Sequence, residues 1–475
     1  MPQFGLALLV LVGALVVCTG LPVFVVLLVA SSLGAVVAIT FGDVPPALFG
    51  ALPSRLVGLL EHDLLQAVPL FVLIGALLDR LPLAELLYRC MCRMRPASPA
   101  MPRVAAVGIS ALLAPMNGSV GASVAMLSRV VAPRLRERGA SAGETTALVA
   151  VASTLGVLVP PSIVLLLLGD TMMRAHTEAL LVTGSSARIL NSQDLMHGVL
   201  APAAVVLAAV VGVAVGQARR SAPAPMAAAP VTSREVAIAV LTALTIAGLL
   251  GGVALGRFYA VEAAATGGML LFVGAALAGE LSGARLRAAL ADTLDITGSL
   301  FALFVAATTF TLLLRALGTD RWVEDAIRHF PGGPGMVLGV ALAVLLLCAL
   351  VLDAFELIFV VFPILMPPVL ARVDDAVWVA VLSMLVLQLS FVLPPIGYAV
   401  MMSSARIRPA PTQRQLLRAL APYLGALAAV GLLVVAQPRL VHLLDASGAA
   451  AASAPSTDEV DRMLQGGGRP PRDVP

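Results

Sequence analysis

The sequence predicts an all-α polytopic membrane protein built from two inverted repeats, and three observations lead to that fold. Composition is the first: 60% of the 475 residues are hydrophobic and 12% are charged, with a mean hydropathy of +1.00. Those values lie outside the range of ordinary globular domains. The second observation is a double proline, Pro160-Pro161 and again Pro394-Pro395, inside each of two long apolar stretches. The third is a polar interruption that precedes each double proline.

The two halves of the chain share one spacing. The double prolines are offset by 234 residues (394 − 160), and the same offset carries Ser119 onto Asp353. Each of these two polar positions interrupts apolar sequence at an equal distance before its double proline. The agreement predicts an internal duplication.

The first half, residues 1–220, begins with three apolar stretches of about the ~20 residues that cross a bilayer. They lie near 4–18, 21–42 and 64–80. Arginines then crowd 81–103, which the positive-inside rule predicts to be a cytoplasmic loop. Basic residues also follow 104–132, so this apolar stretch is predicted to be a re-entrant hairpin with its tip at Asn117 to Ser119.

The next span, 143–170, carries its double proline in the middle. Proline lacks the backbone donor and disfavours the α region for the residue before it, which predicts a broken helix. We expect a polar outer loop at 171–194 and a return span at 196–216. The Pro/Ala-rich segment 221–234 is predicted to be a linker between the halves.

The second half, residues 235–437, repeats the order. Its predicted spans are 235–254, 258–279 and 295–316, then a hairpin at 336–370, a broken helix at 376–403 and a final helix at 414–437. Five crossings and one hairpin per half invert the second copy relative to the first. Residues 438–475, rich in small and charged residues, are predicted to be a disordered tail.

Broken helices and hairpin tips are where membrane carriers hold ions and substrate. Half-helix N-termini offer free N–H groups to anions, while unwound carbonyls and hydroxyls coordinate cations. The predicted substrate-binding residues are Asn117, Ser119, Ser162, Asp353 and Gly397. The predicted cation ligands are Gly118, Ser119, Thr154, Pro160, Asp353, Gln388, Ser390 and Pro394. Such oxygen ligands suit a hard cation such as Na+. The alternative is that the small residues serve helix packing and the prolines are structural kinks.

Carboxylates within apolar sequence need a reason, because a lone charge there costs roughly 3 kcal/mol on insertion scales. Asp353 occupies the tip position equivalent to Ser119 and is predicted to be functional. Glu356 is a candidate for a functional role or for pairing with a neighbouring group. Glu262 is a candidate for the site or for a structural acceptor.

These residues resemble a known family, the large membrane subunit of tripartite ATP-independent periplasmic (TRAP) transporters. The similar passages are Pro69-Leu70-Phe71 with Gly75, Asn117-Gly118-Ser119 with Ala122, Thr154 to Ser162, Asp353-Ala354-Phe355-Glu356 with Pro363 and Pro367, and Gln388 to Gly397. They span roughly residues 5–437. One departure is Gly256 to Ala263, where two threonines typical of the family are replaced and Glu262 is kept.

The resemblance implies Na+-coupled import of an organic acid by an elevator movement, with Na+ sites beside the two hairpin tips. It implies a separate four-helix small membrane subunit and a periplasmic substrate-binding protein as partners, in the bacterial inner membrane. Membrane lipid should surround the helices, and no nucleic-acid partner is expected.

Two other functions compete with this reading. One is a stand-alone ion-coupled carboxylate carrier that needs no binding protein. The other is an intramembrane enzyme, but no HExxH or nucleophile motif supports catalysis. The sequence also lacks a GxxxxGK[ST] motif, so we expect an ion gradient rather than ATP as the energy source.

Overall fold

The protein is entirely helical in the part of the chain that a computed structural model describes, residues 2–41, 44–60, 63–116, 119–220, 231–394 and 396–444. No strand occurs among these residues. Within the described ranges, seven helices are long and apolar enough to cross a membrane, and the number rises to nine if each of two bent helix pairs is one span. The prediction of an all-α polytopic membrane protein is confirmed.

The first part of the chain forms eleven α-helices and two short 3-10 turns within the described ranges. They are α1 Pro2–Thr19, α2 Val23–Thr40, η1 Pro46–Ala51, α3 Leu52–Leu60, α4 Asp63–Arg80, α5 Leu83–Met94, α6 Met101–Leu113, η2 Ala114–Met116, α7 Val120–Val130, α8 Ala132–Glu137, α9 Ala142–Leu158, α10 Ile163–Thr183 and α11 Ser192–Arg220. The pair α9 and α10 is bent by 45° at its break.

The second part continues from the far side of the predicted linker. Its elements are α12 Ser233–Ala254, α13 Ala260–Leu277, α14 Gly283–Ala316, α15 Thr319–Arg328, α16 Pro334–Cys348, α17 Ala354–Glu356, the π-helical turn η3 Leu357–Val361, α18 Phe362–Leu370, α19 Ala376–Val392, α20 Tyr398–Arg406, α21 Gln413–Ala436 and η4 Pro438–Leu440. We call α6, η2 and α7 hairpin 1, and α16 to α18 hairpin 2.

Side-chain caps explain where several of these helices begin. Ser141 accepts a hydrogen bond from the backbone N–H of Glu144 at 3.1 Å, and the Glu144 carboxylate accepts from the Ser141 N–H at 3.1 Å. The same capping box opens α12 at Thr232 and α21 at Thr412. Each box satisfies donors that a helix start leaves free.

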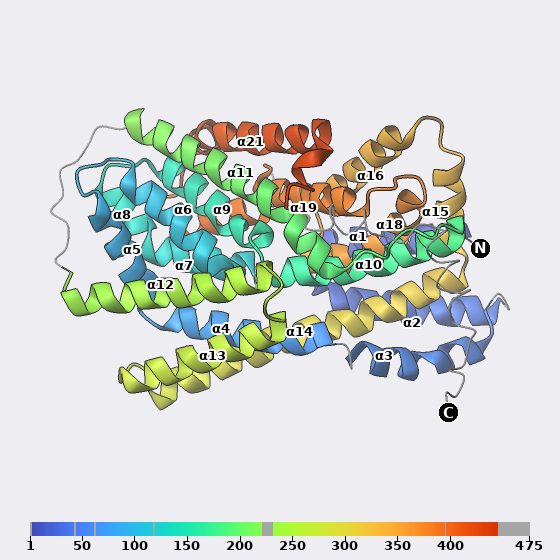
Figure 1. Ribbon diagram of the computed structural model, residues 1–475. Helices are drawn as coiled ribbons and strands as arrows, with labels where there is room; N and C mark the ends of the chain where they lie inside the picture. Colours follow the sequence, from blue (N-terminus) through green and yellow to red (C-terminus); the bar gives the residue numbers. More distant parts are fainter. Residues whose placement is uncertain are drawn as a thin grey trace, which may run out of the picture.

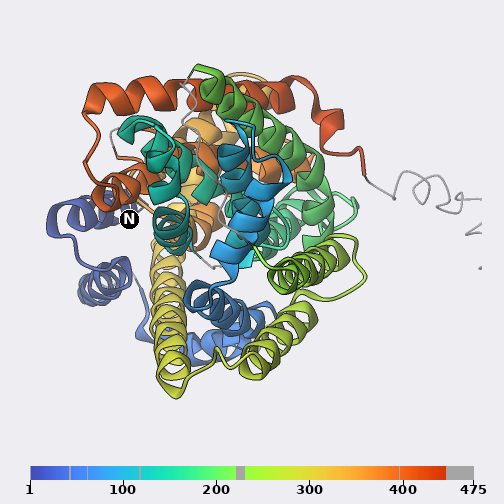
Figure 2. The same ribbon diagram turned by 90° about the vertical axis from the view of Figure 1, so that its left-hand side faces the viewer.

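The helices pack in two groups. Along the lower side of Figure 1, α4 lies beside α13 and α14, and α14 also packs on α2. Along the upper side, α11 and α21 lie side by side, and α21 packs on α9. Seen from the left-hand end, the dark-blue N-terminal helices and the yellow-green α12 and α13 lie on the outside of the molecule (Figure 2).

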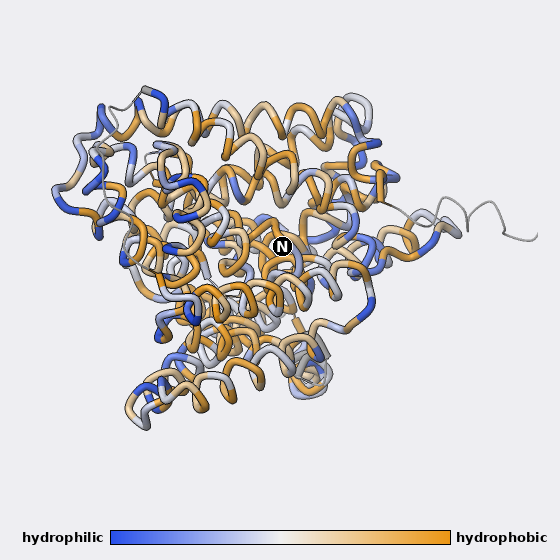
Figure 3. Tube along the Cα trace, turned by 60° about the vertical axis from the view of Figure 1, so that its left-hand side comes forward, coloured by the Kyte–Doolittle hydropathy of each residue, from blue (hydrophilic) through white to orange (hydrophobic). Residues whose placement is uncertain are grey.

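Hydropathy follows the helix axes. The orange, hydrophobic parts of the trace run along the helices, and blue, hydrophilic residues gather in the turns at their ends (Figure 3). Exposed apolar side chains such as Val10, Leu241 and Leu432 lie on the outer helices. A surface of this kind suits a lipid environment.

Several predicted boundaries are wrong. The expected loop 81–103 contains α5, an amphipathic helix whose polar face carries its arginines. The expected outer loop 171–194 is helical as far as Thr183, because α10 continues until Gly184 ends it in the left-handed conformation at φ 65°. The span predicted at 295–316 begins at Gly283. Polar sequence was mistaken for loop in all three places.

The predicted disordered tail also begins too early. After α21 the chain forms the 3-10 turn η4, Pro438–Leu440, and a further turn at 441–444, and Val441 is buried close to Gly198 of α11. The apolar side chain has a packing partner there, which composition alone does not reveal. The remainder of the tail and most of the predicted linker, 221–230, lie outside the described residues.

Candidate functional site

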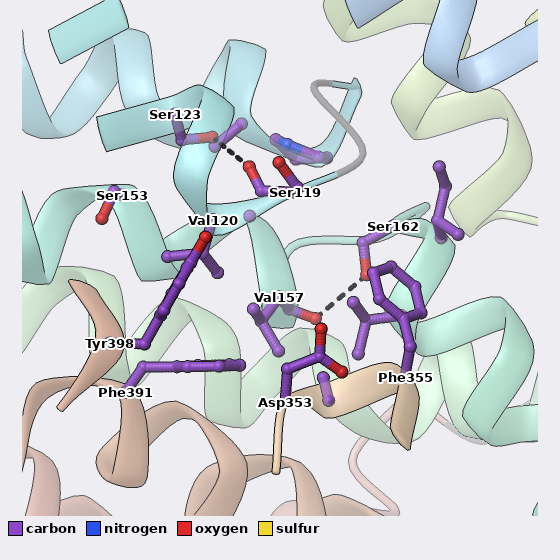
Figure 4. Close-up of a pocket in the computed structure, with 16 residues that line it drawn as sticks. Ser119, Val120, Ser123, Ser153, Val157, Ser162, Asp353, Phe355, Phe391 and Tyr398 are labelled. Atoms are coloured by element: carbon purple, nitrogen blue, oxygen red, sulfur yellow. Dashed lines mark hydrogen bonds between the residues drawn. The ribbon is translucent and has the colours of Figure 1, made fainter. Parts of the chain in front are cut away.

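Four segments meet around a cavity of about 70 Å³ in the middle of the chain's fold. They are hairpin 1, the break between α9 and α10, the tip of hairpin 2, and the facing ends of α19 and α20 (Figure 4). We call this the central cavity. Its walls are formed by Ala114, Pro115, Ser119, Val120, Ser123, Ser153, Gly156, Val157, Ser162, Ile163, Val164, Asp353, Ala354, Phe355, Phe391 and Tyr398.

The break between α9 and α10 is held by a serine. After α9 ends at Leu158, the two prolines carry the chain to Ser162, which is the N-cap of α10. The Ser162 hydroxyl accepts from the backbone N–H of Leu165 at 3.0 Å and donates to the carbonyl of Val157 at 3.0 Å. The Ser162 hydroxyl therefore links the end of α9 to the start of α10, and the start of α10 faces the cavity.

Hairpin 1 presents a second serine cap. The hydroxyl of Ser119 accepts from the backbone N–H of Ala122 at 3.1 Å and so caps α7. The hydroxyl of Ser123 donates to the Ser119 carbonyl at 3.3 Å, as the dashed line in Figure 4 shows. The predicted ligands Asn117 and Gly118 lie outside the described residues. The described part of this tip carries no charge.

Hairpin 2 presents a carboxylate in the corresponding place. Asp353 caps α17 by accepting from the backbone N–H of Glu356 at 2.9 Å, and the Glu356 carboxylate accepts from the N–H of Asp353 at 2.9 Å. Figure 4 shows the Asp353 carboxylate turned toward the break at Val157 and Ser162. Among the described residues that line the central cavity, Asp353 is the one with a charged side chain.

Two glycines allow hairpin 1 to approach its neighbours closely. A Cβ added at Gly156 of α9 would lie 2.5 Å from the carbonyl carbon of Ala114, so the backbones of α9 and hairpin 1 are in direct contact. A Cβ at Gly121 would lie 2.8 Å from the hydroxyl of Tyr398. Tyr398, the first residue of α20, thus reaches across the cavity and rests on α7.

The structure brings three of the predicted residues together, Ser119, Ser162 and Asp353. The other predicted residues that the structure describes do not line the central cavity: Thr154, Pro160, Gln388, Ser390, Pro394 and Gly397. Thr154 and Ser390 are buried and donate to the carbonyls of Val151 and Leu387, each at 2.8 Å. Thr154 lies four residues before the end of α9, and Ser390 lies two residues before the end of α19.

Gln388 is more unusual. Its side chain is 1% exposed, and neither its amide oxygen nor its amide nitrogen has a hydrogen-bond partner among the described residues. A buried amide without a partner costs free energy, so the position needs an explanation.

The two remaining prolines and the glycine shape the breaks without facing the central cavity. Pro160 is buried, and Pro394 is half-buried in the turn after α19. The N–H of Gly397 donates to the carbonyl of Leu393 at 2.8 Å. A Cβ at Gly397 would lie 2.8 Å from the carbonyl oxygen of Phe391, so this turn has no room for a side chain.

Among the polar and aromatic residues that line the cavity, sequence reasoning missed five: Ser123, Ser153, Phe355, Phe391 and Tyr398. A signal existed for two of them. Ser123 lies four residues after Ser119, on the same face of a helix. Tyr398 directly follows the glycine of the second break. The aromatic wall depends on how the two halves face each other, which spacing along one chain does not reveal.

The fold and cavity define a class: a multi-pass helical membrane protein with two interrupted helix pairs and two hairpins around one mainly apolar cavity that carries a few hydroxyls and one carboxyl group. A solved structure with a similar fold is the YdaH transporter of Alcanivorax borkumensis, with a TM-score of 0.54 at 16% identity over 82% of this chain and 88% of that one.

The family follows from the sequence comparison. The model of the DctM component of the tripartite ATP-independent periplasmic transporters matches residues 9–440. The chain therefore belongs to this family of TRAP transporter large permease subunits, which confirms the family resemblance and the prediction that the chain is not an enzyme.

Relatives with known roles are distant but cover most of the chain. The sialic acid TRAP transporter large permease protein SiaM of Vibrio cholerae is 24% identical over 80% of this chain and 86% of its own length. The 2,3-diketo-L-gulonate large permease protein YiaN of Escherichia coli is 22% identical over 70% and 75%. The isethionate permease protein DctMQ of Oleidesulfovibrio alaskensis is 24% identical over 72% of this chain and 52% of its own length.

Glu262, the acid at the departure from the family pattern, has a structural explanation. Its carboxylate accepts from the backbone N–H of Tyr259 at 3.0 Å and caps α13. Glu262 lines neither the central cavity nor any other cavity described here. The structure gives it the role of a helix cap.

Proposed function

We propose that this chain is the large subunit of a Na+-coupled, binding-protein-dependent transporter that imports an organic acid across the bacterial inner membrane. One observation carries the proposal: the N-terminal ends of α7 and α10 meet the Asp353 carboxylate at a single cavity. Helix N-termini favour anions, and a carboxylate favours cations. A cavity with both can take an anionic substrate together with a coupling cation.

The anion would be bound without a basic side chain. Among the described residues lining the central cavity, arginine, lysine and histidine do not occur. The available donors are backbone N–H groups and the hydroxyls of Ser119 and Tyr398, because the hydroxyls of Ser123, Ser153 and Ser162 already donate to backbone carbonyls. Sialic acid, isethionate and 2,3-diketo-L-gulonate, named for the relatives, are organic acids, which supports this substrate class.

Na+ fits the oxygen donors around the cavity. Hydroxyl, amide and carboxylate oxygens are the ligands a hard cation takes. The unpartnered amide of Gln388 would gain a partner by coordinating it. We assign one Na+ to Ser119 and Thr154 in the first half and a second Na+ to Asp353, Gln388 and Ser390 in the second half. Bound Na+ would also offset the repulsion between Asp353 and an incoming carboxylate.

An elevator movement would carry the cavity across the membrane. The hairpins and broken helices would move against the group formed by α2, α4, α13 and α14. The proposal includes a four-helix small membrane subunit and a periplasmic substrate-binding protein as partners, as the family name implies. The competing function is a stand-alone carrier that needs no binding protein.

Uptake into proteoliposomes tests the proposal. Vesicles holding this chain with its small subunit receive the cognate binding protein and an inward Na+ gradient, separately and together. Uptake that needs both is the expected result. Uptake with the gradient alone would favour the stand-alone carrier, and uptake that K+ supports as well as Na+ would contradict sodium coupling.

A further inference from the structure

A second cavity, of about 360 Å³, lies beside the central one and is larger. It is enclosed by α10, α14 and hairpin 2, with α3 at its edge. In Figure 1 these elements lie together on the right-hand side, at the end of the molecule opposite α5 and α8. We call it the second cavity.

Charged side chains from three helices form the rim of the second cavity. Arg55 comes from α3, Arg174 with Asp170 and Glu178 from α10, and Arg315 from α14. Arg174 pairs with Asp170 at 3.0 Å, and Arg315 pairs with Glu178 at 2.9 Å. Three arginines against two carboxylates leave one positive charge in excess, and Arg55 has no ion pair among the described residues.

The floor of the second cavity is apolar and aromatic. The rings of Phe304 on α14 and Phe359 on hairpin 2 meet edge to face with their centroids 4.1 Å apart. Pro363, Pro367 and Ala307 continue the same surface. A ligand that fits both parts has an anionic group for the arginines and an apolar body for the floor.

The two cavities are adjacent along two helical segments. On α10, Val164 lines the central cavity and Leu167 lines the second. On hairpin 2, Phe355 lines the central cavity and Phe359 the second. Three to four residues are one helical turn, so about 5 Å separates the walls. Phe359 also lies within a π-helical turn, a feature frequent at functional sites.

We propose that the second cavity is a vestibule that holds the substrate by its carboxylate before it enters the central cavity, and that the substrate is an amphipathic carboxylate. This inference rests on the proposed function and deepens it. Arg55 and Arg174 bind the carboxylate, while Phe304 and Phe359 contact the apolar part. The vestibule faces the outer side, because it lies at the end of the molecule opposite α5 and α8, whose arginines mark the cytoplasmic side by the positive-inside rule.

Photolabelling tests the vestibule directly. The complex of this chain with its small subunit is placed in phosphatidylcholine vesicles and irradiated with 4-benzoylbenzoate, an aromatic carboxylate, or with neutral 4-methylbenzophenone. Labelled peptides are identified by mass spectrometry. We expect the carboxylate to label α10, α14 and hairpin 2, and Arg55→Gln combined with Arg174→Gln to reduce that labelling about fivefold.

The matched control is Arg328→Gln, which removes an arginine of α15 that lines neither cavity and pairs with Glu324 within its own helix. It should leave labelling unchanged. Arg55→Gln alone is the second variant, since Arg55 has no ion pair among the described residues whose loss could unfold the chain. It should reduce labelling in the same direction.

Three results would overturn the vestibule: labelling insensitive to the arginine variants, equal labelling by the neutral probe, or loss of labelling when phosphatidylglycerol is added. The last would identify a lipid headgroup as the ligand. Labelling needs neither a gradient nor the binding protein. Failed uptake with intact labelling would therefore count against the proposed function alone. Intact uptake with failed labelling would count against the vestibule alone.

Discussion

The two hairpin tips place different chemistry on one cavity. Ser119 and Asp353, which the 234-residue offset pairs, are both N-caps and both line the central cavity. The hydroxyl of Ser119 is neutral, whereas Asp353 brings a carboxylate that closes a capping box with Glu356. The two tips therefore have similar local structure, but hairpin 1 contributes a neutral hydroxyl to the cavity and hairpin 2 contributes a carboxylate.

The broken helices differ in the same sense. At the first break Ser162 caps a helix of 21 residues and is buried. At the second, Gly397 precedes a helix of nine residues and offers no side-chain cap, and Tyr398 reaches over to α7 instead. The first half supplies most of the hydroxyls, and the second half supplies the carboxylate and most of the aromatic wall. The side-chain chemistry of the central cavity is thus divided between the halves rather than duplicated.

Of the four substitutions, Asp353→Asn should have the largest effect, because it removes the carboxylate that the second half contributes to the central cavity. Asparagine caps a helix as well as aspartate does, so hairpin 2 stays folded while the cavity loses its charge. A contact to a charged group is worth about 1.5–3 kcal/mol, so the half-saturating Na+ concentration for uptake should rise about 10- to 100-fold. Measuring uptake against Na+ concentration checks this. An unchanged curve would remove Asp353 from the cation site.

Gly156→Ala should break the contact between α9 and hairpin 1. The new Cβ would lie 2.5 Å from the Ala114 carbonyl carbon, and overpacking of this kind costs about 1–3 kcal/mol. Thermal unfolding of the purified chain measures the loss. Gly212→Ala on α11 is the control, because a Cβ there meets nothing within 4 Å. Equal stability of both variants would mean that the close contact is absent.

Ser162→Ala should destabilise the first break by about 1 kcal/mol, the usual value of an N-cap. The variant loses both the bond from the Leu165 N–H and the bond to the Val157 carbonyl. Ser383→Ala is the control, since that buried hydroxyl only adds a bond to the carbonyl four residues before it in α19. A melting temperature equal to that of Ser383→Ala would show that the break does not depend on this cap.

Ser119→Ala should have the smallest effect of the four. It removes one neutral cation ligand and one cap, so the half-saturating Na+ concentration should rise about threefold. That rise corresponds to a loss of roughly 0.7 kcal/mol of binding free energy. The same uptake curves measure it. A larger rise than that of Asp353→Asn would reverse the proposed division between the hairpin tips.

Much of the fold could be predicted because membrane helices leave strong signals. Long apolar stretches located α1, α2, α12 and α21 to within a few residues. Amphipathic helices such as α5 and α15 were missed, because their polar faces look like loop when hydropathy is averaged.

The site could be predicted only in part. Ser119, Ser162 and Asp353 were found because a polar residue or a proline interrupts apolar sequence at each place. The aromatic residues Phe355, Phe391 and Tyr398 look like ordinary core residues in the sequence. The second cavity was also missed, because Arg55, Arg174 and Arg315 come from three separate helices.

The central claim is that Asp353 gives the central cavity its affinity for Na+. The most direct measurement is the melting temperature of the purified chain in Na+ and in K+ at equal ionic strength, for the wild type and for Asp353→Asn. An ion that binds only the folded state stabilises it. The account predicts that Na+ raises the wild-type melting temperature above its value in K+ and that Asp353→Asn loses this difference. An equal Na+ effect in both proteins would contradict it.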